Sequence, residues 1–99
     1  MRPGSRAWFA EVEERYGPDL LTLPGYDRCL LGVVTQSDNT VLLYDREKVI
    51  AQLVREFTEA ARPAPLPLDE ATAEAEEWFA FNIVGAWTGR HTPAFSSPL

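Results

Sequence analysis

The sequence predicts a small α+β domain in which three helices pack on a β-hairpin, in the order α-β-β-α-α. Apolar residues recur at three- and four-residue intervals in three segments, which is typical of amphipathic helices. Between the first and second of these segments, two β-favouring runs flank a polar turn. The 99 residues suit one core, so we expect a single domain over 1–99 with its ordered part at 5–95.

The first helix is expected to start after Ser5, whose side chain can cap it, and to stop at Gly17 and Pro18. One face carries the apolar residues Trp8, Phe9, Val12 and Tyr16. Residues 19–27 contain a further proline and a further glycine, so an irregular connection is expected there.

The hairpin is predicted from two apolar, partly β-branched runs at 29–35 and 40–44, joined by the polar residues 36–39. Cys29, the single cysteine, begins the first run, and we expect its thiol to be buried as a small apolar group. One cysteine cannot form an internal disulfide.

The second helix has the strongest helical pattern in the chain. Asp45 can cap it, and apolar residues repeat over 46–61. Its expected core residues are Val49, Leu53 and Phe57. Three prolines at alternate positions within 62–68 cannot continue a helix, and they predict an extended connector inside the domain.

The third helix is expected to be capped by Asp69 and to bury one apolar side. That side carries Ala71, Ala75, Trp78, Phe79 and Ala86. Asn82 falls in the middle of the same arc, where a buried amide must be hydrogen-bonded. We therefore expect Asn82 to bind backbone groups of the segment after Gly85 or of the hairpin, with ligand contact as the alternative.

Composition and motifs argue against most chemistry. The formal charge of −6 disfavours direct binding to nucleic acid and to anionic lipid. The sequence has no apolar stretch long enough to span a bilayer and no secretory signal pattern, so a cytoplasmic protein is expected. Cys29 and His91 are the only Cys–His pair, and neither metal-ligand spacing nor a glycine-rich nucleotide loop occurs. We expect no catalytic residue, no metal and no cofactor, and hence no enzyme.

Two candidate sites remain. A stripe along one edge of the third helix would suit a protein partner with a basic surface, although a merely solvated helix face has the same pattern. The stripe consists of Glu70, Glu74, Glu77 and Phe81. The alternative is a small-ligand site formed by Asn82, Trp87, Arg90, His91 and Thr92. A hairpin edge that pairs with a second copy leaves a homodimer open as a third hypothesis.

The segment from about residue 25 to residue 95 also shows a resemblance. The patterns Phe-x-Phe-Asn at 79–82, Gly-Ala-Trp-x-Gly at 85–89 and Thr-Pro-x-Phe at 92–95 follow related stretches at 25–34 and 44–50. In order and spacing this resembles a family of small uncharacterised bacteriophage and bacterial proteins, although the family usually has a short glycine-containing turn where this chain has its proline-rich segment. The resemblance implies a phage or mobile-element setting, in which an inhibitor of a host nucleic acid-handling or defence machine (anti-CRISPR-like) is expected.

Overall fold

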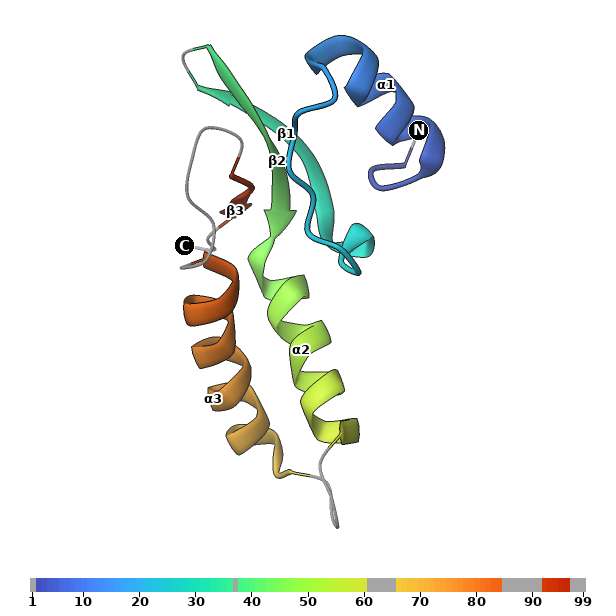
Figure 1. The fold of residues 1–99 in the computed structure, drawn as a ribbon. Coiled ribbons are helices and arrows are strands. Elements are labelled where there is room, and N and C mark those ends of the chain that lie inside the picture. The colour runs from blue at the N-terminus through green and yellow to red at the C-terminus, as the bar shows by residue number, and fades with distance from the viewer. Residues whose placement is uncertain (1, 37, 61–65, 85–91, 97–99) are drawn as a thin grey trace. The chain divides into compact units, whose positions relative to one another are not determined.

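A computed structural model describes residues 2–36, 38–60, 66–84 and 92–96. The chain forms two compact units, Met1–Arg46 with Thr88–Leu99 and Glu47–Trp87, and each is described by itself. The α+β class is confirmed, since the described residues contain three α-helices and a β-hairpin in the predicted order (Figure 1). Three elements were not predicted: a 3-10 turn before the hairpin, a π-helical turn after the third helix and a third strand.

Helix α1, Arg6–Tyr16, begins and ends where the capping residues predict. The Ser5 hydroxyl accepts a hydrogen bond from the Trp8 backbone N–H at 3.2 Å, which satisfies one of the free donors at the helix N-terminus. At the other end Gly17 has a φ of 91°, and its N–H donates to the Glu13 carbonyl oxygen. Val12 is the buried residue of this helix.

Gly4 lies in the turn before α1 with a φ of 89°, a region that L side chains rarely adopt. A Cβ at this position would also overlap the carbonyl oxygen of Asp27. Gly25 has nearly the same φ, 88°, but open space around it.

We expect Gly25→Ala to lower the free energy of unfolding by about 1–2 kcal/mol, and Gly4→Ala to lower it further because the backbone must also move. Urea titration of both variants checks this, and equal losses would contradict the role of the close approach.

The hairpin is confirmed, with a tighter turn than predicted. Strands β1, Leu30–Gln36, and β2, Asn39–Asp45, pair antiparallel, and Gln36 pairs with Asn39, so two residues connect the strands instead of four. The first strand starts one residue late because Cys29 ends a 3-10 turn, η1 (Asp27–Cys29). The thiol of Cys29 is buried, as expected.

A third strand, β3 (Ala94–Ser96), pairs with β2 in parallel, so the sheet is mixed, with the order β1-β2-β3. The register joins Leu43 to Ala94 and Asp45 to Ser96. A run of three residues is too short to show the period-two alternation from which strands are predicted, and this strand was missed for that reason.

Tyr44 lies at the centre of the first unit and is fully buried. Its hydroxyl accepts a hydrogen bond from the Leu23 backbone N–H at 2.7 Å, and its ring centroid lies 5.9 Å from that of Phe95 on β3. Burial, which disfavours the charged phenolate, raises the pKa of Tyr44 to about 12. This one side chain therefore ties the irregular segment before η1 to two strands of the sheet.

Helix α2, Arg46–Ala60, matches the predicted segment up to the last described residue. Val49 and Leu53 are buried as expected. Phe57 is only half-buried, so its predicted core position is wrong. Its ring instead packs edge-on against Trp78 of the neighbouring helix, with centroids 6.3 Å apart, at a surface that is open to solvent.

Helix α3, Leu68–Trp78, lies beside α2 and runs back along it (Figure 1). It begins two residues earlier than predicted, because a cap at Asp69 would start the helix at Glu70, and its N-cap is Pro67, which makes no side-chain capping hydrogen bond. The prediction that Asp69 caps the helix is therefore wrong. Asp69 lies in the first turn, where its charge still interacts favourably with the positive end of the helix dipole. Of the predicted connector 62–68, residues 62–65 fall outside the described residues.

The helix continues into a π-helical turn, η2 (Phe79–Val84). The buried residues along α3 and η2 recur at four-residue intervals: Ala71, Ala75, Phe79 and Ile83. On a regular α-helix such a stripe would drift by about 40° at each step. A π-helical turn holds more residues, so each residue advances by a smaller angle and Ile83 stays on the buried side.

The same turn explains one of two wrong predictions on this helix. Asn82 was expected to be buried and is exposed. It lies three residues after Phe79, and the smaller rotation per residue in the π-helical turn places it away from the buried stripe and toward the side of Trp78. Trp78 was placed in the core and is 40% exposed, since it lies at the edge of the buried arc. Ala86, the last expected core residue, lies outside the described residues.

Candidate functional site: an acidic and aromatic groove

The second unit carries a surface groove of about 370 Å³. We call it the α3 groove. Its lining residues are Phe57, Glu74, Glu77, Trp78, Phe81 and Asn82. All but Phe57 come from α3 and η2, so the unbroken helical path from 68 to 84 positions the site.

Helical spacing brings the carboxylates and the aromatic rings together. Glu74 lies three residues before Glu77 and four before Trp78, and Phe81 follows Glu77 by four, so each is a neighbour on one helix surface. Phe81 is 72% exposed. Phe57 fixes Trp78 from the α2 side through their edge-to-face contact. The groove therefore combines two solvent-exposed aromatic rings with two carboxylates.

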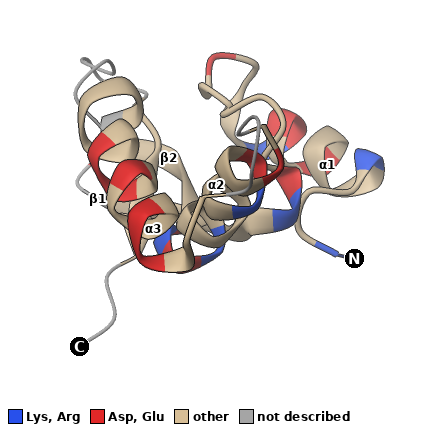
Figure 2. Cartoon of the chain, turned by 90° about the horizontal axis from the view of Figure 1, so that it is seen from below, with Lys and Arg blue, Asp and Glu red and all other residues tan. Residues whose placement is uncertain are grey.

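The net charge of the chain is concentrated in the unit that carries this groove. The unit Glu47–Trp87 contains eight acidic and three basic residues, a net of −5 out of the total of −6. Helix α3 alone has five acidic residues and no basic one (Figure 2). No carboxylate on α3 can therefore pair with a lysine or arginine one turn away on the same helix.

This arrangement has a cost that can be measured. Glu74 has like-charge neighbours at Glu70 and Glu77, and each like-charge pair at such spacing destabilises a helix by about 0.2–0.5 kcal/mol. Since Glu74→Gln removes both pairs, we expect it to raise the free energy of unfolding by about 0.4–1 kcal/mol. Glu11→Gln should instead lower the free energy of unfolding, because it removes the ion pair of α1 between Glu11 Oε1 and Arg15 Nη2, which lie 3.0 Å apart. Urea titration at low salt compares the two, and a Glu74→Gln variant less stable than wild type would contradict the like-charge argument.

The structure brings most of the predicted partner-binding stripe into the groove. Glu74, Glu77 and Phe81 line it, whereas Glu70 is exposed one turn earlier and does not. Of the alternative ligand-binding set, Asn82 also lines the groove. Thr92 is half-buried in the other unit. Trp87, Arg90 and His91 lie outside the described residues.

Sequence reasoning missed the contribution of Phe57 and Trp78, because both were assigned to the core as apolar residues at helical spacing. One signal was available. Trp78 follows Glu74 by four residues and precedes Phe81 by three, so it belongs to the predicted stripe as well as to the buried arc. A residue on the border of two faces can serve either one.

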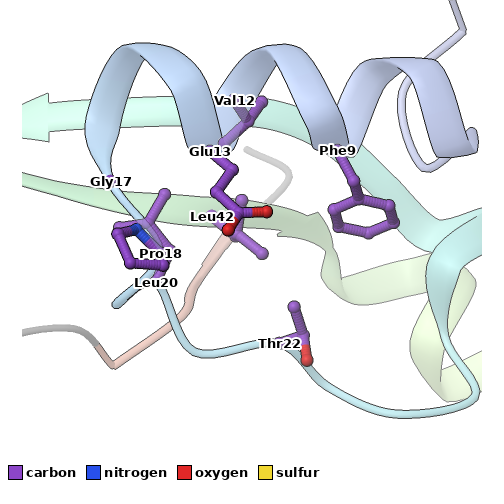
Figure 3. A pocket seen from close by; sticks show the side chains of 8 residues that line it. All are labelled: Phe9, Val12, Glu13, Gly17, Pro18, Leu20, Thr22 and Leu42. Atoms are coloured by element: carbon purple, nitrogen blue, oxygen red, sulfur yellow. The ribbon is translucent and has the colours of Figure 1, made fainter.

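The first unit has a smaller hollow of about 170 Å³ between α1 and the segment that follows it, over Leu42 of β2 (Figure 3). Most of its wall is apolar, and Glu13 brings a carboxylate into it (Figure 3). Its lining residues are Phe9, Val12, Glu13, Gly17, Pro18, Leu20, Thr22 and Leu42. This hollow could not be predicted from the sequence, because its walls come from separate segments.

Comparison with protein-family models, with curated proteins and with solved structures found no match. The resemblance to small phage and bacterial proteins therefore stays a prediction. Within the described residues, three or more metal-binding side chains do not cluster anywhere. None of the described helices has the length and apolar character needed to cross a membrane.

Proposed function

We propose that this protein is a non-enzymatic protein-binding domain and that the α3 groove receives a basic segment of its partner. The observation that carries the proposal is Phe81, an aromatic side chain 72% exposed beside Trp78 and next to the carboxylates of Glu74 and Glu77. Exposed aromatic residues that gather in one groove mark interaction surfaces, and they dominate the energy of protein interfaces.

The energetic costs of the groove support a binding role. The aromatic rings of Trp78 and Phe81 are exposed to solvent, which leaves apolar area unburied. Acidic side chains are neighbours on α3, which contains no basic residue, so their charges repel. A basic partner would relieve both costs at once, because it would cover the rings and neutralise the carboxylates. Residues that lower the stability of a fold are typical of functional surfaces.

The class of partner that we propose follows from the negative charge of α3 and from the phage or mobile-element setting. The five carboxylates of α3 would attract a basic protein surface and speed its association. In the phage or mobile-element setting that the resemblance implies, such a surface is the nucleic acid-binding groove of a host enzyme or defence complex. Under this proposal the protein inhibits that machine by occupying its basic groove, without itself binding nucleic acid.

Quantitative affinity capture from host lysate tests the proposal. We expect one partner to be recovered with the tagged wild-type protein, and recovery to fall about tenfold or more in a Glu77→Gln, Phe81→Ser double variant, which loses an aromatic anchor and a charge. Glu70→Gln is the matched control, because Glu70 is on the same helix but outside the groove. Recovery should also fall as salt is raised. A partner retained equally by all three proteins would rule out the α3 groove as its binding site.

A small-ligand module is the second candidate, favoured by the exposed amide of Asn82 in the groove. Because Asn82 is exposed, Asn82→Leu should change the free energy of unfolding by less than about 0.5 kcal/mol. Loss of ligand binding in Asn82→Leu with an unchanged melting curve would support this candidate.

Turnover by the purified protein that disappears in Cys29→Ser or His91→Ala, with the fold intact, would overturn the non-enzymatic assignment.

A further inference from the structure

We propose that the α3 groove selects arginine over lysine in its partner, an inference that rests on the proposed function. The groove differs from an ordinary acidic helix face in one respect. Its carboxylates, Glu74 and Glu77, stand next to aromatic rings that water can reach, those of Trp78 and Phe81. A group that fits both features must be cationic and must have a flat apolar face.

One of the two aromatic rings of the groove, that of Trp78, is held in place before any partner binds. Trp78 packs edge-to-face on Phe57 at an interplanar angle of 73°, so the contact between α2 and α3 orients its ring. The π-helical turn, which follows directly on α3, determines the backbone position of Phe81. A guanidinium can stack on either ring, and stacking gains both cation–π attraction and buried apolar area.

The carboxylates supply the second half of the recognition. Glu77 lies one turn before Phe81, and Glu74 lies one turn before Trp78, so each ring has an acidic neighbour at helical spacing. The planar guanidinium presents five N–H donors and can stack through its face while its edge donates to a carboxylate. The same two contacts cannot be made by one ammonium group, which has no planar face.

Exposure of the groove decides against lysine. In an open site an ammonium group keeps most of its water, and an exposed ion pair contributes little to binding. The guanidinium is more weakly hydrated, so it loses less when it stacks on a ring. Lysine should therefore bind through general charge attraction alone, and arginine through charge and stacking together.

The test uses two capped glycine-rich peptides of equal charge, one with two arginines and the other with two lysines in their place. Both are titrated into the full-length protein, and binding is followed by the NMR shifts of the Trp78 indole N–H. The Trp8 indole, in the other unit, is the internal control. We expect the arginine peptide to bind about two- to fivefold more tightly.

Three variants assign the effect. Phe81→Leu keeps the apolar volume but removes one of the two π faces, so it should reduce the arginine preference and leave lysine binding unchanged. Glu77→Gln should weaken the binding of both peptides, and Glu70→Gln, which lies outside the groove, should weaken it less. Equal or tighter binding of the lysine peptide by the wild-type protein, or an arginine preference undiminished in Phe81→Leu, would overturn the arginine inference while the proposed function stands. No shift of Trp78 with either peptide would count against the proposed function itself.

Discussion

Leu53→Ala is expected to lower the free energy of unfolding by about 2–5 kcal/mol. Leu53 is 2% exposed on the buried side of α2, so truncation removes apolar contacts and leaves a cavity that its neighbours fill only in part. A loss of that size is a large share of the stability of a domain this small. Urea titration measures the loss, and hydrogen exchange should show the amides of α2 among the better protected.

Leu68→Ala is the matched control, because the same side chain is 72% exposed at the start of α3. Its stability should stay within about 0.5 kcal/mol of wild type. Similar losses in the two variants, or unprotected amides across α2, would mean that Leu53 does not belong to a packed core.

The second large effect is expected at alkaline pH. Burial raises the pKa of Tyr44 to about 12 in the folded protein, whereas the unfolded chain has the ordinary value near 10. The neutral phenol therefore favours the folded state, and its contribution is complete below pH 10. As the pH rises from 10 to 12 the unfolded chain loses this proton first, and about 2–3 kcal/mol of stability should be lost.

Tyr44→Phe separates this group from the others that titrate in the same range. At neutral pH the variant should be less stable by about 1–3 kcal/mol, because the Leu23 N–H loses its acceptor in a buried position. Between pH 10 and 12 its stability should fall less steeply than that of wild type. Parallel curves for the two proteins would show that Tyr44 is not desolvated in the folded state.

The helices could be predicted because local signals determine them. Ser5 and Gly17 supply opposite caps for α1, and the apolar repeat of α2 leaves little choice of buried face. The hairpin followed from two β-favouring runs around a polar turn. Helical spacing alone also predicts that Glu74, Glu77 and Phe81 share one surface, and the three residues line one groove, while their role in partner binding stays a prediction.

The remaining features depend on tertiary structure. The side of the helix on which Asn82 lies was predicted with a constant 100° per residue, and the π-helical turn breaks that assumption at Phe79. Phe57 lies half-buried at a helix–helix contact, which periodicity within α2 cannot reveal. Strand β3 forms by pairing with the edge of β2. Its three residues are too few to show an alternating pattern from which a strand could be predicted.

The parallel pairing of β2 with β3 has a consequence for the order in which the protein folds. Leu43 pairs with Ala94, fifty-one positions further along the chain, and the whole of the second unit lies between them. Helical contacts within that unit are local and form quickly, whereas closing so long a loop costs more entropy and slows the contacts that depend on it. The helical pair should thus form early, and the sheet should be completed last. A chain still emerging from the ribosome would carry Tyr44 without its Phe95 partner until the final residues of β3 are free, so this aromatic contact marks the end of folding.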